Sequence, residues 1–273
     1  GILEGIIGSG YTGGKNINLS GILDGDDRFG FSVSLDGNQL AVGAPYDDGS
    51  ANALSNSGAV YLFSFTDSVF SGGVLESRIG RNYAGGKNYN PANLTGASDY
   101  FGWSVSLDAN RLAVGAYYDD GLANAKGDSG AVYLFSFADS VFTTPTLQSI
   151  LGYNYTGGKN FNLSTLEVSD TFGSGVSLDG NRLAVSSYGY DGFGNAAALS
   201  GAAYLFTFSD SLFSSPTLQA TMGYGYTGGK NINMNMLETG DSISGIALEG
   251  SVLALGAWGD DGFGGGAALG AQY

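Results

Sequence analysis

Hydrophobic and polar residues alternate in short stretches along this chain, and no stretch of about 11 residues carries the 3.6-residue period of a helix. The stretch FSVSL at 31–35 ends in Asp-Gly-Asn and leads directly into QLAVGA at 39–44. Two strand-like stretches joined by a tight turn of this composition predict a hairpin. A loop with Asp-Asp-Gly then leads to GAVYLFSF at 58–65, and a polar linker leads to VLESRIG at 74–80. The pattern predicts four consecutive strands.

This four-strand pattern recurs along the whole chain. Its copies begin at Phe29, Phe101, Phe172 and Ile243, which lie 72, 71 and 71 residues apart. The third stretch returns as GAVYLFSF at 130–137, GAAYLFTF at 201–208 and a short GAQY at 270–273. Repeated four-stranded units predict a β-propeller, in which each unit is one blade around a central axis. We therefore expect an all-β fold of four blades.

The two ends of the sequence indicate how the ring closes. Residues 1–8 (GILEGIIG) resemble the fourth strand of the other units, whereas the last unit stops at Tyr273 within its third strand. We expect the N-terminal strand to complete the last blade. Residues 1–273 would then form a single domain with units at 9–80, 81–152, 153–223 and 224–273 plus 1–8. The alternative is a segment of a longer propeller or repeat array.

One pair of short motifs resembles a known blade. Phe29-Gly30 is followed by Gly43-Ala44-Pro45 and then by GAVYLF, which resembles the FG-GAP repeat. That repeat forms the blades of the integrin α-subunit propeller and of many large bacterial surface proteins. The second unit keeps Phe101-Gly102 and the third keeps Phe172-Gly173, but the fourth has Ile243-Ser244. The resemblance implies a propeller and an adhesive role outside the cell.

The resemblance does not extend to the calcium site of integrin-type blades. In those blades an Asp-rich calcium loop lies on the hairpin between the first and second strands. Here that hairpin is only LDGN at 35–38, LDAN at 107–110, LDGN at 178–181 or LEGS at 248–251. These turns are too short to surround an ion that takes six or more oxygen ligands.

Composition narrows the functional classes. The formal net charge is −15, which disfavours nucleic acid and anionic membrane surfaces as partners, because such binding relies on Lys and Arg. The chain has no Cys and no His, so it lacks disulfides, thiolate nucleophiles and the commonest general base. Apolar runs such as AVYLF at 131–135 are far shorter than the ~20 residues that span a bilayer. Any catalysis would depend on carboxylates, tyrosines or lysines.

The phrase YTGGKN, or YAGGKN in one copy, occurs four times and places lysine at Lys15, Lys87, Lys159 and Lys230. Strand alternation predicts that these links between blades share one face with the Asp-Asp-Gly loops. Each lysine is then expected to reach a recurring carboxylate, from one of two rows: Asp48, Asp120, Asp191 and Asp261, or Asp27, Asp99, Asp170 and Asp241. The lysines either fix the loops structurally or form a polar rim for a ligand.

Aromatic residues precede or lie within the Asp-Asp-Gly loops, and exposed aromatic rings beside carboxylates are typical of protein- or sugar-binding surfaces. The predicted ligand face comprises Tyr46, Asp48, Tyr118, Asp120, Tyr190, Asp191, Trp258 and Asp261 with the four lysines; Tyr117 and Tyr188 lie beside it. Alternatively, the rings only pack the loop bases. Calcium is a further candidate ligand, held by Asp47, Asp48, Asp119, Asp120, Asp260 and Asp261. Alternatively, these carboxylates cap turns by bonding to their own backbone.

Three functions follow, from different classes. The first is an extracellular or cell-surface binding module without enzymatic activity, which recognises a protein or glycan through the loop-rich face. The second is a structural spacer or filament-forming unit that binds copies of itself. The third is a carboxylate-based glycosidase, which needs one asymmetric pair of carboxylates. Near-identical loops in each unit favour the first two.

Overall fold

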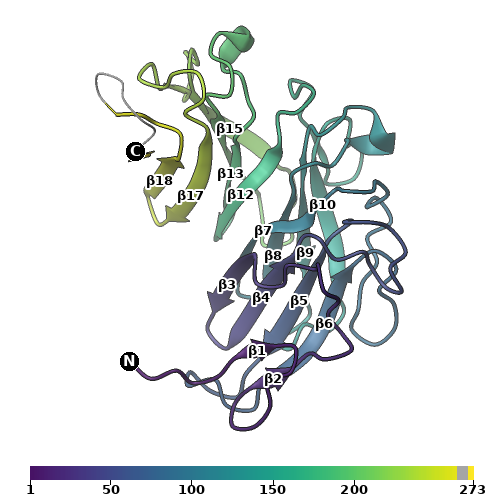
Figure 1. Cartoon of the computed structure of the whole chain (residues 1–273). Helices are drawn as coiled ribbons and strands as arrows, with labels where there is room; N and C mark the ends of the chain where they lie inside the picture. The colour runs from purple at the N-terminus through teal and green to yellow at the C-terminus, as the bar shows by residue number, and fades with distance from the viewer. Residues whose placement is uncertain (263–269) are drawn as a thin grey trace.

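The computed structural model describes residues 1–262 and 270–273; four of its sheets are arranged as the blades of a propeller, beside a small sheet of two short strands (Figure 1). The first blade contains β3 (Ser32–Asp36), β4 (Gln39–Ala44), β5 (Ala59–Ser64) and β6 (Val74–Gly80). The second contains β7 (Phe101–Asp108), β8 (Arg111–Ala116), β9 (Ala131–Ser136) and β10 (Thr146–Gly152), with β11 (Phe161–Asn162) parallel to β10. The predicted all-β, four-bladed fold is confirmed.

The other two blades repeat this order. The third contains β12 (Phe172–Asp179), β13 (Arg182–Ser187), β14 (Ala202–Thr207) and β15 (Thr217–Gly223), with β16 (Ile232–Asn233) parallel to β15. The fourth contains β17 (Ile243–Glu249), β18 (Val252–Ala257) and β19 (Ala271–Gln272). Two short 3-10 helices, η1 (Leu122–Asn124) and η2 (Phe193–Asn195), lie in the loops between second and third strands. Among the described residues, no helix has the length and apolar character needed to cross a membrane.

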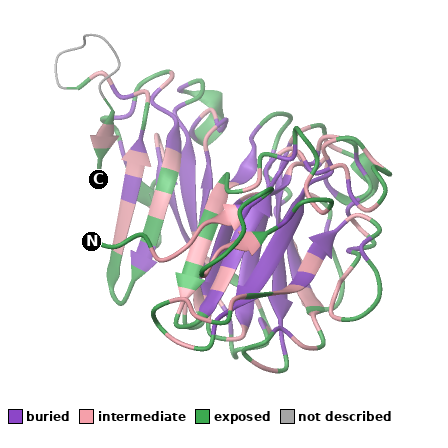
Figure 2. Cartoon of the chain, turned by 60° about the horizontal axis from the view of Figure 1, so that its bottom comes forward, coloured by how far each residue is buried: buried purple, intermediate pink, exposed green. Residues whose placement is uncertain are grey.

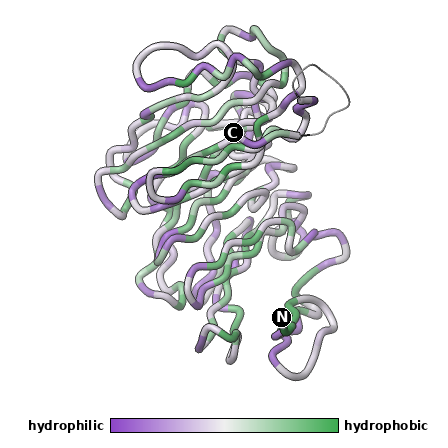
Figure 3. The backbone as a smooth tube through the Cα atoms, turned by 90° about the vertical axis from the view of Figure 1, so that its left-hand side faces the viewer, coloured by the Kyte–Doolittle hydropathy of each residue, from purple (hydrophilic) through white to green (hydrophobic). Residues whose placement is uncertain are grey.

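The core lies between consecutive blades. Figure 2 shows buried residues concentrated in the central strands, and Figure 3 shows hydrophobic residues along the strands and hydrophilic ones in many of the loops. Val60 and Leu62 on one blade pack in the same cluster as Phe101 and Val105 of the next. Val132 and Leu134 likewise pack with Phe172 and Val176. Burial of alternate strand positions therefore joins each blade to its neighbour.

The two recurring glycine motifs meet across a blade interface. Gly102 has φ of 90°, and a Cβ at this position would lie 2.5 Å from the carbonyl oxygen of Ala59 in the preceding blade. A Cβ at Gly43 would lie 2.0 Å from the carbonyl oxygen of Gly102. Only glycine permits this approach and this backbone conformation. In the third interface both positions are serine instead, and Ser186 Oγ donates to the Ser244 carbonyl at 2.8 Å.

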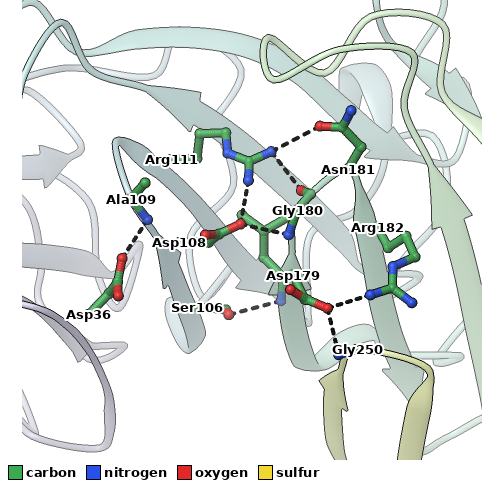
Figure 4. A network of polar contacts seen from close by, with 11 residues as sticks. Asp36, Ser106, Asp108, Ala109, Arg111, Asp179, Gly180, Asn181, Arg182 and Gly250 are labelled. Atoms are coloured by element: carbon green, nitrogen blue, oxygen red, sulfur yellow. Dashed lines mark hydrogen bonds and ion pairs between the residues drawn. The ribbon is translucent and has the colours of Figure 1, made fainter.

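Hydrogen bonds also join neighbouring blades at the end that carries the hairpins between first and second strands (Figure 4). The carboxylates of Asp36, Asp108 and Asp179 accept from the backbone N–H groups of Ala109, Gly180 and Gly250, at 2.6, 2.8 and 2.9 Å. Arg111 pairs with Asp108 and donates to the Gly180 carbonyl at 2.6 Å. The hairpin aspartate therefore has a structural role, which is to hold the turn of the next blade.

The predicted closing strand is the one part of the fold that the structure contradicts. β1 (Ile7–Gly8) pairs in parallel with β2 (Ile17–Asn18) and not with the sheet of β17, β18 and β19. The backbone N–H of Ile6 donates to Asn16 Oδ1 at 2.8 Å, and Ile7 packs against the first blade. Residues 1–8 resemble a fourth strand because β1 pairs with the link that follows it, as β10 pairs with β11. These local hydrogen bonds place the segment beside the first blade.

Candidate functional site on the loop face

The turns between second and third strands form one end of the propeller, which we call the loop face (described residues 45–58, 117–130, 188–201 and 258–262). In the second blade, Asp119 starts the Asp-Asp-Gly turn and is only 2% exposed. Its carboxylate accepts hydrogen bonds from the hydroxyls of Tyr133 at 2.6 Å and Tyr155 at 3.0 Å, and from the backbone N–H of Gly121 at 2.8 Å. We call this arrangement the tyrosine–aspartate junction.

The same junction occurs in two other blades. In the first blade Asp47 accepts from Tyr61 at 2.6 Å, Tyr83 at 2.9 Å and the Gly49 N–H at 2.7 Å. In the fourth, Asp260 accepts from the Tyr273 hydroxyl and from the Gly262 N–H. A buried carboxylate must be paired or hydrogen-bonded to be tolerated, and these donors meet that need. In these three blades, the first Asp of the turn therefore stabilises the folded loop.

Burial also changes the acidity of these groups. Burial raises the pKa of Asp47 and of Asp119, although the tyrosine and backbone hydrogen bonds oppose the rise. Burial, reinforced by the nearby charge of Asp119, raises the pKa of Asp99 to about 8. Both Asp99 and Asp119 are 2% exposed, so a substrate has no access to them. Their raised pKa values reflect packing and do not indicate an acid–base pair for catalysis.

The third blade departs from this pattern. Tyr190 occupies the position of Asp47 and Asp119, so the equivalent strand tyrosine, Tyr204, has no carboxylate to bind. The Tyr204 hydroxyl is buried and makes no close hydrogen bond in the described structure; only the Tyr226 hydroxyl interacts with it. Tyr190 instead packs beside Tyr226, with ring centroids 6.0 Å apart. A cavity of about 520 Å³ opens here.

Cavities occur at the corresponding place in two other blades. The one in the first blade has a volume of about 370 Å³ and is lined by Asp27, Asp47, Arg78 and Tyr83, with the Arg78 guanidinium 4.4 Å from the Tyr83 ring centroid. The one in the fourth blade measures about 470 Å³ and is lined by acidic residues that include Asp241 and Asp260. The three cavities therefore differ in chemistry although the blades share one fold.

An aromatic belt crosses the first three blades beside these turns. It comprises Tyr46, Tyr100, Trp103, Tyr117, Tyr118 and Tyr188. Trp103 stacks on Tyr117 with centroids 3.9 Å apart, and Tyr117 lies 4.0 Å from Tyr118. Tyr100 joins this group to Tyr46 at 4.9 Å, where the Arg28 guanidinium covers the outer ring at 3.8 Å. All belt residues except the buried Tyr117 are partly exposed. The belt is therefore a continuous surface for contact with a ligand.

Comparison with protein families identifies the repeat. The family model described as FG-GAP repeat matches three times, at residues 24–63, 92–135 and 166–206, and each match covers the strands that bring the two glycine motifs together. These are FG-GAP repeats. No curated protein matches the chain. Among solved structures it is similar to the computationally designed Ika8 protein (crystal packing No. 1 in P63), with 10% identity and a TM-score of 0.39. The match covers 83% of this chain and 42% of the designed one.

The FG-GAP blades do not bring all the predicted ligand residues together. Tyr46 and Tyr118 lie in the belt, whereas Tyr190 lines the third-blade cavity and Trp258 is 67% exposed on the fourth blade. The second Asp of the turn stabilises its own loop in three blades: Asp48, Asp120 and Asp191 accept from the N–H groups of Asn56, Asp128 and Leu199 at 2.6 to 2.8 Å. Asp261 lines the fourth-blade cavity.

The calcium hypothesis at the turn aspartates gains no support. Asp47, Asp119 and Asp260 accept from tyrosines, and Asp48 and Asp120 accept from backbone N–H groups, as described above. In residues 1–262 and 270–273 no group of three or more carboxylates is placed to hold a metal ion. The residues Asp27, Asp99, Asp170 and Asp241 each accept from the backbone N–H three residues earlier, at 2.6 to 3.0 Å. These acidic residues stabilise turns, which was the alternative that the sequence left open.

The lysines of the recurring phrase contact neither row of aspartates, so that expectation was wrong. Lys87 pairs with Glu76 of its own blade and donates to the Val141 carbonyl of the next blade at 2.7 Å. Lys159 donates to Gln148 Oε1 and to the Leu212 carbonyl, each at 2.6 Å. Val141 and Leu212 lie in loops between third and fourth strands, at the end opposite the loop face. The lysines therefore connect blades at that end.

The two other lysines of the phrase lie at the same end of the propeller, opposite the loop face. Lys15 pairs with Glu4 and donates to the Val69 carbonyl. Lys230 donates to Gln219 Oε1 at 2.7 Å. The tyrosine that opens the phrase, and not its lysine, reaches the loop face, as Tyr83 and Tyr155 show. In the sequence, this tyrosine recurs once per repeat, as the turn does, and this recurrence could have indicated a contact between them. It does not show which residue of the phrase points toward the turn.

Proposed function

We propose that this FG-GAP propeller is a binding module without enzymatic activity, located outside the cell or on its surface, which recognises a protein or glycan through the loop face. The observation that carries the proposal is the aromatic belt. Its rings span three blades, five of the six are partly exposed, and each combines a large apolar face with a polar group. Tyr and Trp with this exposure are enriched at recognition surfaces.

Two further observations support this function. FG-GAP propellers are generally non-enzymatic, and FG-GAP repeats are typical of extracellular or surface proteins. Two of the carboxylates with raised pKa values, Asp99 and Asp119, are enclosed, so a substrate does not reach them. The net charge of −15 disfavours nucleic acid as the ligand.

The test is binding of the purified protein to a glycan array and to an array of secreted proteins, with Tyr118→Ala as the belt variant. Tyr118 lies at the centre of the belt, so its loss should weaken binding at least tenfold without unfolding the protein. Val69→Ala is the matched control, because Val69 is 49% exposed and lies in a loop at the opposite end. Binding that Tyr118→Ala leaves unchanged would contradict recognition through the belt.

One observation supports the alternative function, a structural spacer or filament-forming unit. The side chains of Phe31, just before β3, and of Val33 and Leu35 on β3 are 43%, 64% and 51% exposed. The residues equivalent to the last two, Val105 and Leu107 of β7, are 8% and 6% exposed because a blade covers them. This apolar face is available to a second copy of the chain. Light scattering of the purified protein tests the idea: self-association that Val33→Asp abolishes would support it, and a monomer at all concentrations would reject it.

A further inference from the structure

The cavity of the third blade is built from three segments that are distant in sequence. The link after β11 supplies Ser164 to Glu167, the loop containing η2 supplies Phe193 to Asn195, and the end of β15 with the following link supplies Thr221 and Tyr226. Tyr190 and Tyr204 also line it, and Lys126 reaches it from the second blade. Its volume of about 520 Å³ lies within the range of about 300–1,000 Å³ typical of small-molecule sites.

Two substitutions between blades explain why the space is open. Tyr133 in the second blade pairs across the strands with Ile150, and Tyr204 in the third pairs with Thr221. Ile150 is 2% exposed and belongs to the core, whereas threonine lacks its outer methyl group. The second substitution is Tyr190 in place of the buried aspartate. Together these changes distinguish the third-blade cavity from the second blade, whereas the first and fourth blades have a cavity beside an intact junction, with Arg78 or carboxylates in its lining.

The buried hydroxyl of Tyr204 is a second, independent indication of a ligand site. Tyr204 is 2% exposed and lines the cavity, and its hydroxyl has no close hydrogen-bond partner among the described residues; only the Tyr226 hydroxyl interacts with it. In the other blades the equivalent hydroxyl donates to aspartate at 2.6 Å. A buried hydroxyl without a close acceptor is unfavourable, which favours a polar partner that enters the cavity.

The lining specifies the chemistry of that partner. Three rings meet there: Phe193 lies 5.5 Å from Tyr226 edge-on, and Tyr190 lies 6.0 Å from Tyr226. Hydrogen-bonding groups at the rim include Asn195, whose amide donates to Glu167 Oε2 at 3.1 Å. Rings that cover apolar C–H faces, together with a carboxylate and an amide that bind hydroxyls, suit a neutral polyhydroxylated ring. Glu167 and the nearby Asp170 and Asp191 disfavour a phosphate or carboxylate ligand.

We propose that this cavity is a saccharide subsite, which holds one neutral pyranose ring against Tyr226 and Phe193 with its hydroxyls bonded by Glu167 and Asn195. The proposal rests on the binding function proposed above and assigns it a glycan as ligand. The cavities of the first and fourth blades do not share this role, because the guanidinium of Arg78 lines one and several carboxylates line the other.

The experiment is saturation-transfer NMR of the full chain with a panel of neutral mono- and disaccharides. The decisive variant is Thr221→Ile, which restores the side chain found in the second blade and should fill the cavity. We expect the wild type to bind at least one saccharide and Thr221→Ile to bind it at least tenfold more weakly, with an unchanged melting temperature. Phe193→Ala is the second variant, because its ring is 62% exposed and its removal does not disturb the core.

The matched control is Leu122→Ala, at the equivalent loop position of the second blade, where binding should not change. The proposal is overturned if no saccharide of the panel binds, or if Thr221→Ile and Phe193→Ala both bind as tightly as the wild type. Binding on the arrays that is lost in Tyr118→Ala but retained in Thr221→Ile would preserve the loop-face function and reject this subsite. Loss in Thr221→Ile and Phe193→Ala, with Tyr118→Ala unaffected, would preserve the subsite and reject the belt.

Discussion

The second and third blades have the same strands and nearly the same turns, yet one is closed and the other is open at the loop face. In the second, Asp119 accepts from two tyrosines and Ile150 fills the space beside them. In the third, Tyr190 and Thr221 occupy those positions, the Tyr204 hydroxyl has no close hydrogen-bond partner, and a cavity appears. Tyr190 and Thr221 therefore give the third blade a cavity lined by aromatic rings at the place where Asp119 and Ile150 pack in the second blade.

The largest effect is expected from the closed junction. Asp119→Ala leaves two buried tyrosine hydroxyls and the Gly121 N–H without an acceptor, which should lower the free energy of unfolding by about 3 kcal/mol. In the third blade, Tyr190→Phe removes a hydroxyl from a site with no such carboxylate and should cost about 1 kcal/mol or less. Urea denaturation of both variants measures the difference. Equal losses would show that the two junctions do not differ in stability.

Opening the closed blade should have the next largest effect. Ile150→Thr removes a buried methyl group and introduces a hydroxyl, so the free energy of unfolding should fall by about 2 kcal/mol. Thr221→Ile is the reciprocal change and should leave stability unchanged or slightly higher. A crystal structure of Ile150→Thr should show a cavity beside Tyr155. An unchanged denaturation midpoint for Ile150→Thr would mean that this position does not close the blade.

Asp99, which lies near the charge of Asp119, should also make stability depend on pH. The pKa of Asp99 is raised to about 8, above the ~4 of an unfolded chain, so the folded state holds a proton that the unfolded state has lost between these values. Stability should be greatest near pH 4 and fall as pH rises toward 8. The melting temperature of Asp99→Asn should change less over that range. Asp26→Asn, at an exposed position, removes the same formal charge and is the control. A wild-type slope that Asp99→Asn leaves unaltered would assign the dependence to other groups.

The smallest effect is expected from the lysines at the opposite end. Lys159→Met loses its hydrogen bonds to Gln148 and to the Leu212 carbonyl of the next blade, which should cost about 0.5–1 kcal/mol because the site is partly exposed. Lys230→Met loses one bond, to Gln219 within its own blade, and should cost less. Chemical denaturation of the two variants checks this order. A larger loss for Lys230→Met would show that the lysines do not act between blades.

The sequence was sufficient to predict the four blades, because the strand pattern and the period of 71 or 72 residues are local and repeated. The direction of side chains within the links was not predictable in the same way. Tyr83 and Lys87 are four residues apart, yet one reaches Asp47 and the other reaches Val141 at the opposite end. The chain reverses between them at two glycines with φ of 80° and 60°, so strand alternation does not apply there.

The candidate site was predictable only in part for a similar reason. The aromatic residues of the turns were visible in the sequence, and Tyr46 and Tyr118 do lie in the belt. Trp103 joins them through its stack on Tyr117 within the second blade, and Tyr100 joins them through a contact with Tyr46 of the preceding blade. The cavity was still harder to predict from the sequence, because it depends on the pairing of Tyr204 with Thr221 across two strands separated by a loop. Sequence similarity predicted that the N-terminal strand closes the last blade. A strand pairs with the strand edge that lies nearest in space, however, and for β1 that edge is β2.

The contact between Gly43 and Gly102 has a consequence for anyone who builds smaller versions of this protein. The glycine of one repeat meets its partner only in the following repeat, so the functional unit of the motif crosses the boundary between sequence copies. A single repeat excised at its sequence limits would lack half of this contact. A shortened protein should therefore contain at least two successive repeats, and an added repeat should stabilise it by creating one more glycine contact of this kind.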